Sequence, residues 1–278
     1  MTEQGFESVF DGSTLAGWRA IPRRYGRLYP GGPDLLAASP DLPRDYQERA
    51  DAHPAAWTVE DGAIVGRQHP EGSGYGGYLI SDRSFSDFEL RLEANPDWPA
   101  DTGIMLRRNR DSWEGLQVLV DHRQSGSIGG FYGNGIGGFH AVPFALDVQR
   151  DGSGAPVGLR PDDPSTSVEP FSPAKRAMLT RGATVEEFLA VWRWADWNEF
   201  TIRCVGRKPT TTVWINGLLV AEIDLATLEA PNYDADAVAD ALGGHIAFEV
   251  HDNDPRLGEG RWAPSARCRW RDIRIKEL

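Results

Sequence analysis

The sequence predicts an all-β protein, either a sandwich or a jelly roll of antiparallel strands. Short segments of strand character recur along the 278 residues, and tight-turn signals such as Asn216-Gly217 separate them. The 31 glycines and 19 prolines suit a chain with many turns, because these residues favour the backbone angles that turns require. The length suits one large β domain, and we expect residues 1–278 to form a single domain.

Strands are predicted where apolar residues alternate with other residues, or where β-branched and aromatic residues form short runs. Phe88, Leu90 and Leu92 alternate with charged residues, as in a strand with one buried and one solvated face. Asn216-Gly217 predicts a two-residue hairpin, because a type I′ turn needs positive φ at both central residues. The expected strands are 57–59, 63–65, 77–80, 88–94, 103–107, 116–121, 200–205, 211–215, 218–223, 245–250 and 267–275.

Helix is scarce, and we expect one or two short helices. Thr184 and Glu187 form a capping-box pattern that predicts a helix over 184–192, and a weaker pattern favours one over 235–242.

Three long segments, 20–56, 126–139 and 150–173, are predicted to be loops. Loops of this length in a compact domain are usually functional or disordered. We interpret the first two as binding loops and the third as a flexible excursion, and we expect loop insertions over about 20–56 and 126–195.

Three of the predicted strands carry chemically active residues on alternate positions. Successive side chains of a strand point to opposite faces, so one phase can fill a core while the other faces away. The core phase comprises Ile104, Leu106, Leu116, Val118, Val120, Ile246, Phe248 and Val250. The other phase comprises Met105, Arg107, Gln117, Leu119, Asp121, His245, Glu249 and His251. If the three strands share one sheet, these polar side chains converge on one surface.

Composition and charge exclude several classes of partner. The formal net charge is -12 and no Lys/Arg block dominates, apart from a local patch of Arg23, Arg24 and Arg27, so we expect no nucleic-acid partner. No apolar stretch approaches the roughly 18 residues of a membrane span, and the N-terminus lacks a signal-peptide pattern. We therefore expect a cytoplasmic protein without a membrane partner. Cys204 and Cys268 are expected to be buried free thiols.

Common catalytic motifs are missing from the sequence. The glycine-rich segment 129–138 lacks the Lys-Ser/Thr ending of a phosphate loop, so no nucleotide cofactor is expected; a mobile glycine and aromatic loop beside a sugar site fits better. There is no Gly-x-Ser-x-Gly elbow. The closely spaced carboxylates of retaining β-sandwich glycosidases are not found either, which disfavours that mechanism.

The late histidines allow a metal site. His245, Glu249 and His251 share one strand face and could bind one divalent ion together with Asp121 or Gln117 from a neighbouring strand. Within that set we expect Asp121 and His251 to be the ligands. The alternative is that the histidines are structural residues held by hydrogen bonds.

Ordered sequence blocks resemble the family of 3-keto-disaccharide hydrolases, also called domain of unknown function 1080. The first block is Val9-Phe-Asp-Gly-Ser-Thr-Leu-Ala-Gly-Trp18, and the last is 270–278. Between them lie the blocks 57–66, 85–90, 102–107, 117–122, 197–200, 215–217 and 244–251. The chain departs from the family at Gly115, where a glutamate is common, and at Glu249, where a glutamine is common. Whether Glu114 replaces the missing glutamate stays open.

The resemblance implies a concanavalin A-like jelly roll whose concave sheet binds a sugar. It also implies that a C3 ketone acidifies the C2 hydrogen of a glycoside, a base removes that proton, the C1 substituent is expelled, and water adds to the enone. We expect the catalytic residues to be His251, Glu249 and Asp121. We expect the substrate-binding residues to be Arg107, Gln117, His122, His245 and Tyr132. The alternative is a non-catalytic carbohydrate-binding module of the same fold. The sequence sets no oligomeric state.

Overall fold

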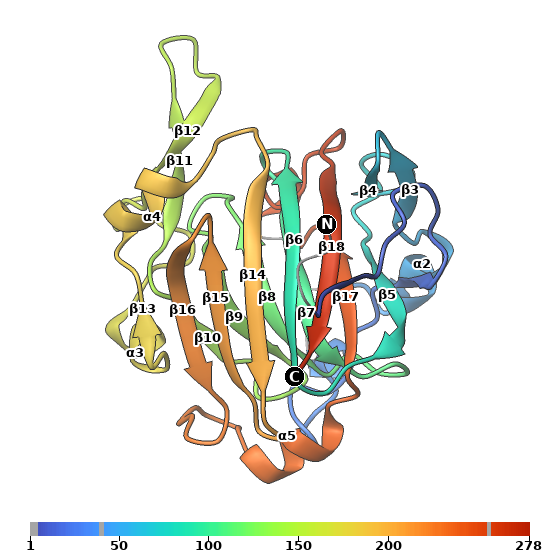
Figure 1. Cartoon of the computed structure of the whole chain (residues 1–278). Helices are drawn as coiled ribbons and strands as arrows, with labels where there is room; N and C mark the ends of the chain where they lie inside the picture. The colour runs from blue at the N-terminus through green and yellow to red at the C-terminus, as the bar shows by residue number, and fades with distance from the viewer. Residues whose placement is uncertain (1–4, 39–41, 255–256) are drawn as a thin grey trace.

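Two antiparallel sheets face each other in a computed structural model that describes residues 5–38, 42–254 and 257–278 (Figure 1). One sheet has nine strands and the other has seven, and a separate two-stranded sheet lies beside them. The prediction of an all-β sandwich of two antiparallel sheets is confirmed.

The nine-stranded sheet contains the strands predicted at 57–59, 63–65, 88–94, 200–205, 211–215, 218–223 and 267–275. Its strands, in spatial order, are β13 (Arg181–Gly182), β16 (Leu218–Asp224), β15 (Thr210–Ile215), β14 (Asn198–Val205), β6 (Phe88–Pro96), β18 (Cys268–Glu277), β4 (Ala63–Arg67) and β3 (Ala56–Glu60), with β1 (Glu7–Ser8) paired to β18.

The seven-stranded sheet brings together the three strands with polar phases. Its strands, in spatial order, are β10 (His140–Ala141), β9 (Ile128–Asn134), β8 (Gly115–Asp121), β7 (Asp101–Arg108), β17 (His245–Val250), β5 (Gly77–Ser84) and β2 (Trp18–Pro22). Since β8, β7 and β17 are direct neighbours, the expected sharing of one sheet is confirmed.

The core lies between the two sheets, and strand alternation explains its composition. All residues of the predicted core phase, from Ile104 to Val250, belong to one buried hydrophobic cluster. In the opposite sheet, Phe88, Leu90 and Leu92 of β6 are buried while the residues between them are half-buried. Phe248 stacks on Trp18 and Trp270, with ring centroids 5.2 and 4.9 Å apart. Both cysteines are buried free thiols, as predicted.

The predicted hairpin is present between β15 and β16. Ile215 pairs with Leu218, and Asn216 and Gly217 have φ of 49° and 85°, so both central residues adopt the positive φ that the turn requires. The Asn216 side chain also donates to the Asn198 side chain at 2.7 Å.

Both predicted helices are present, and the described residues contain three further short ones. α4 (Val185–Val191) begins after Thr184 with both hydrogen bonds of the capping box, and α5 (Ala235–Ala241) follows Asp234. The additional helices are α1 (Leu35–Ala38), α2 (Tyr46–Ala52) and α3 (Pro173–Ala177). The described residues thus contain more helices than the one or two expected, because helices this short show almost no periodicity and, among the five, only α4 has the complete capping box. No helix in the described ranges has the length and hydrophobicity to cross a membrane.

The loop predicted over 126–139 is wrong, because this segment contains β9. Neighbouring side chains pack closely against its glycines. A Cβ added at Gly133 would lie 2.5 Å from the Phe139 ring, and one added at Gly129 would lie 2.7 Å from Val220. The glycine content therefore reflects tight packing of a strand in the seven-stranded sheet.

Part of the segment predicted as a loop over 150–173 forms a strand pair instead. β11 (Leu146–Arg150) and β12 (Pro156–Pro161) form a hairpin that projects beyond the sandwich in Figure 1. Asp151 closes its turn by accepting from the backbone of Ser153 and Ala155. The loop predicted over 20–56 likewise contains the end of β2 and two of the short helices.

Candidate active site

A charged pocket of about 250 Å³ lies on the face of the seven-stranded sheet that points away from the core. We define this charged pocket by Asp101, Asp121, Arg123, His251 and Arg261, all of which line it. Strands β7, β8 and β9 supply its floor, and segments far apart in sequence supply its walls. The pocket therefore depends on the complete fold.

Unbroken alternation along β8 places its polar phase in the charged pocket. Gln117, Leu119 and Asp121 line the pocket, whereas Val118 and Val120 are buried in the core. Tyr132 and Asn134 reach the same space from β9, and Tyr132 was predicted to bind substrate. These side chains face a common space because the strands are paired in register.

Glu249 lies beneath the charged pocket, fully buried, and does not line it. Its carboxylate accepts from Arg23 Nε at 2.8 Å and from Gln117 Nε2 at 2.6 Å. Gln117 Oε1 in turn accepts from Asn134 Nδ2 at 2.9 Å. Glu249 thus fixes the orientation of an arginine and an amide that do face the pocket.

Arg23 connects the 20–56 segment to the sheet. Besides Glu249, its guanidinium contacts Asp252 at 3.0 Å and His251 Nε2 at 3.0 Å, and the residue is only 4% exposed. Asp252 also accepts from the hydroxyl groups of Tyr25 and Tyr46. Burial alone would raise the pKa of Asp252, but Arg23 outweighs that effect and holds the pKa below its usual range.

His251 lines the charged pocket with both ring nitrogens in contact with neighbours. Nδ1 lies 2.7 Å from the carbonyl oxygen of Asp252, and Nε2 lies 3.0 Å from Arg23 and 3.4 Å from Arg261. Burial and Arg23 lower the pKa of His251, but Asp101 and Asp252 raise it above its ordinary value. A guanidinium can only donate, however, so a proton on Nε2 would face two donors. We therefore assign the neutral ring, with Nδ1–H donating to Asp252 and Nε2 accepting.

Two buried carboxylates share one arginine at the centre of the charged pocket. Asp101 and Asp121 are cross-strand partners on β7 and β8, and Arg123 Nε lies 3.5 Å from one carboxylate and 3.1 Å from the other. Asp101 also pairs with Arg261. Both carboxylates are at most 4% exposed, so their charges interact with little screening by water.

These two carboxyl groups have pKa values that move in opposite directions. Burial raises the pKa of Asp121 to about 7; Arg123 opposes this shift, and the charge of Asp101 adds to it. Burial also acts to raise the pKa of Asp101, but positive charge on its neighbours, on His251 when the ring is protonated and on Arg261 and Arg123, outweighs it and holds that pKa below the usual Asp value. At neutral pH, Asp101 is ionised while Asp121 exchanges its proton readily.

The family-model comparison identifies the chain. The model of the 3-keto-alpha-glucoside-1,2-lyase-like domain matches residues 5–276, which confirms the resemblance seen in the sequence. The chain belongs to this family. Among curated proteins, none matches its sequence.

Solved structures with similarity to this 3-keto-alpha-glucoside-1,2-lyase-like domain are distant. A candidate glycosyl hydrolase from Parabacteroides distasonis is 12% identical, with 99% of this chain and 94% of that chain covered and a TM-score of 0.47. A carbohydrate-binding module from Bacillus subtilis is 10% identical, with coverages of 80% and 92% and a TM-score of 0.44. A glycosyl hydrolase family protein from Mycobacterium fortuitum is 10% identical, with coverages of 96% and 95% and a TM-score of 0.43. Values this low carry no argument about function.

The residues of the lyase-like domain do not fit the divalent metal site considered from the sequence. Within the described residues, no group of three or more His, Cys, Asp or Glu side chains is arranged to hold a metal ion. The two expected ligands, Asp121 and His251, are each in contact with guanidinium groups, from Arg123 on one side and Arg23 and Arg261 on the other. A dication there would be repelled by three permanent positive charges. The pocket places these three guanidinium groups beside four carboxyl groups, those of Asp101, Asp121, Glu169 and Asp254, so it suits a polar ligand that forms several hydrogen bonds.

Arg107 lies outside the charged pocket because β7 has an irregular register. His245 of β17 pairs with Arg108, but Ala247 pairs with Met105, and Arg107 adopts a φ of 47°. The irregularity reverses the alternation beyond Leu106, so Arg107 donates to Asp87 at 2.8 Å near the start of β6. Arg108 points to the face of the sheet that was expected for Arg107. Its Cζ lies 4.5 Å from the centroid of the Tyr78 ring.

His245 and His122 also lie outside the charged pocket. His245 is six residues before His251, and in an extended strand this separates them by about 20 Å; its Nδ1 is bonded to the carbonyl groups of Ser81 and Arg83. His122 follows Asp121 and therefore faces another pocket, beside Trp192 and Trp194. Glu114, the possible substitute at Gly115, accepts from Ser112 and does not line the charged pocket.

Several pocket residues were not identified from the sequence. Asp101 and Arg123 continue the alternation of two predicted strands by two residues, so longer strand predictions would have found them. Asn134 follows Tyr132 by two residues on β9, which was taken for a loop. No periodic signal marks the residues that come from non-strand segments. These are Arg23, Arg261 and Glu169, the last of which accepts from Arg123 at 2.7 Å.

Proposed function

We propose that the charged pocket cleaves 3-keto-glycosides by removing the C2 proton and eliminating the C1 substituent. One observation carries this proposal: two adjacent buried carboxyl groups, Asp101 and Asp121, have pKa values shifted in opposite directions within a pocket that also holds three arginines. A base that titrates near neutral pH beside fixed positive charge suits proton abstraction next to a carbonyl group.

Asp121 acts as the general base in this proposal. The C2–H bond breaks, its proton passes to the Asp121 carboxylate, and the electron pair forms a C2=C3 bond that leaves negative charge on the C3 oxygen. Asp121 suits this role better than Glu249 or His251. Glu249 is fully buried with both oxygens engaged, and the Nε2 atom of His251 accepts from Arg23.

The arginines stabilise the charge on the C3 oxygen. Arg107 was expected to bind substrate but lies outside the pocket, so in this proposal Arg23, Arg123 and Arg261 take this role and Gln117 orients a hydroxyl group. When the C3=O bond re-forms, the electrons move to a C1=C2 bond and the C1–O bond breaks. Protonated Asp121 supplies the proton for the leaving oxygen. Water then adds across the C1=C2 bond and gives net hydrolysis.

The test is the cleavage of a 3-keto-glucoside compared with the same glucoside carrying an ordinary C3 hydroxyl. We expect turnover of the 3-keto compound alone, because the C2 proton is acidic only beside the ketone. Asp121→Asn should lower kcat by about 100-fold or more, the usual contribution of general base catalysis. Asp82→Asn, an exposed aspartate on β5, is the matched control and should retain activity.

Two outcomes would contradict this proposal. Binding of the 3-keto compound without turnover would favour the non-catalytic carbohydrate-binding alternative, and undiminished turnover in Asp121→Asn would remove Asp121 from the reaction.

A further inference from the structure

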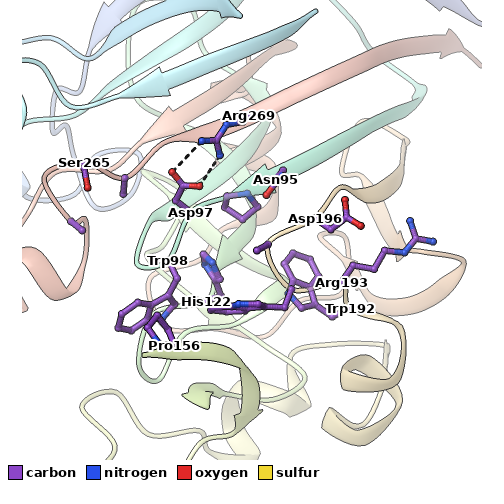
Figure 2. Close-up of a pocket in the computed structure, with 15 residues that line it drawn as sticks. Asn95, Asp97, Trp98, His122, Pro156, Trp192, Arg193, Asp196, Ser265 and Arg269 are labelled. Carbon is purple, nitrogen blue, oxygen red and sulfur yellow. Dashed lines mark hydrogen bonds and ion pairs between the residues drawn. The ribbon is translucent and has the colours of Figure 1, made fainter. Parts of the chain in front are cut away.

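A second pocket, of about 530 Å³, lies at the end of the sandwich where β6 ends and β18 begins (Figure 2). We call it the aromatic pocket and define it by Trp98, Trp192, Trp194 and His122. The segment between α4 and β14 supplies Trp192 and Trp194, and the residues after β6 and β8 supply Trp98 and His122. The proposed reaction uses none of these side chains.

The aromatic pocket contains hydrogen-bonding groups that lack partners. Trp98 Nε1, Trp192 Nε1 and His122 Nδ1 are buried atoms without a hydrogen-bond partner in the described part of the chain. His122 is 2% exposed, and burial lowers its pKa to about 4, so the ring is neutral at pH 7. Buried polar groups are nearly always satisfied in native proteins, so a polar occupant of the pocket, a ligand or ordered water, is the natural partner for these three atoms.

The walls of the aromatic pocket are held in place before any ligand binds. Trp192 stacks on the buried Phe188 with ring centroids 5.5 Å apart. At the opposite wall, Asp97 forms a bidentate pair with Arg269 at 2.7 and 3.3 Å, as Figure 2 shows. Binding therefore does not have to order these side chains, which favours affinity for a small ligand.

We infer that the aromatic pocket binds one pyranose ring of an ordinary, unoxidised glycoside. A pyranose has C–H faces that stack on indole rings and a rim of hydroxyl groups that accept from Trp Nε1 and exchange hydrogen bonds with a neutral imidazole. A purely apolar ligand would leave the three buried polar atoms unsatisfied. The charged residues that line the pocket, Asp97 and Asp196 with Arg193 and Arg269, are balanced in sign, so they leave no net charge to select an ionic ligand.

The aromatic pocket and the charged pocket are built on shared segments but use different residues. Asp121 lines the charged pocket, and the next residue, His122, lines the aromatic pocket. Likewise, Asp101 lines the charged pocket and Trp98 lines the aromatic pocket. Sugar binding at the aromatic pocket therefore requires neither a ketone nor the carboxylate pair, and it stands whether or not the proposed reaction occurs.

The test measures binding of the unoxidised methyl glycosides of glucose, galactose, mannose and N-acetylglucosamine by saturation-transfer NMR and calorimetry on the full chain. We expect millimolar binding of at least one of them, retained in Asp121→Asn. Trp194→Ala should weaken it about tenfold, because aromatic stacking of this kind is worth roughly 1.4 kcal/mol, and Trp194→Phe should fall between. Trp197→Ala is the matched control, since its ring lies against Arg271 at 4.0 Å and does not line the pocket.

Thermal melting of each variant verifies that it is folded. Absence of binding for all four glycosides at high millimolar concentration would overturn the inference. So would binding that survives in Trp194→Ala but is lost in Asp121→Asn, because the sugar would then occupy the charged pocket.

Discussion

Asp101 and Asp121 differ in protonation because they differ in the number of cations that each one contacts. Asp101 is paired with Arg261 and lies 3.5 Å from Arg123, whereas Asp121 has Arg123 as its nearest cation. Two like charges this close cannot both be fully ionised without cost, so the carboxyl group with less compensation keeps a proton to higher pH. The difference in neighbours therefore assigns the base.

Removing the charge of Asp101 should move the pH dependence of the reaction. If Asp121 must be ionised to accept the C2 proton, kcat/KM rises as pH increases through about 7, its pKa. Asp101 contributes to raising that pKa, so in Asp101→Asn the pKa of Asp121 falls and the rising limb moves to lower pH. A profile of kcat/KM between about pH 5 and pH 9 measures the shift. A limb that stays in place or moves upward would show that Asp121 is not the titrating group.

At the scale of single elements, the glycines of β9 obscure its strand pattern in the sequence, so this segment was predicted to be a loop. Gly133 faces the ring of Phe139, and the segment from Phe139 back to β9 is held by hydrogen bonds from Gly133 and Gly138. The strand carries Tyr132 and Asn134 into the charged pocket. The absence of a side chain at Gly133 therefore lets β9 lie against Phe139 while Tyr132 and Asn134 face the pocket.

Substitution of Gly133 should test this packing. In Gly133→Ala the new Cβ would lie 2.5 Å from the Phe139 ring, so the ring or the strand has to move, and we expect the free energy of unfolding to fall by about 1 to 3 kcal/mol. Gly152→Ala in the β11–β12 turn is the matched control, since an added Cβ there meets nothing within 4 Å. Urea denaturation compares the two variants. Equal stability of both variants would show that the packing around Gly133 accommodates an added methyl group.

At the scale of the whole molecule, the pKa of Asp121 connects the charged pocket to global stability. The carboxyl group titrates near 3.8 in an unfolded chain and at about 7 in the fold, so its protonated form favours folding. That contribution is complete below about pH 4 and is lost as pH rises through about 7. The Asn side chain does not titrate, so the stability of Asp121→Asn has no such loss over this pH range.

The stability of Asp121→Asn relative to the original chain should therefore increase with pH. We expect a difference in the free energy of unfolding that is small near pH 4 and grows to a few kcal/mol by pH 8. Urea denaturation at several pH values measures it, with Asp82→Asn as the exposed control whose difference stays constant. Parallel stability curves for Asp121→Asn and the original chain would contradict the raised pKa.

The sequence predicts those parts of the molecule that follow strand periodicity. Gln117 and Asp121 were located from alternation alone, because the extra residue at the register shift between Val118 and Val120 lies on β9 and leaves the alternation of β8 intact. Arg107 was misplaced because a change of register in β7 leaves no mark in the residue pattern. Arg23 and Arg261 reach the charged pocket from outside the strands, and only tertiary packing brings such segments to a sheet.

The irregular register of β7 falls between two adjacent arginines. If a relative of this chain lacked one residue of β7, Arg107 and Arg108 would exchange the faces of the sheet to which they point. Each face would still receive one guanidinium group. Because the two arginines are adjacent, each face of the sheet carries one guanidinium group in either strand register. A single arginine at this position would behave differently, because a one-residue change in β7 would move its charge from one face of the sheet to the other.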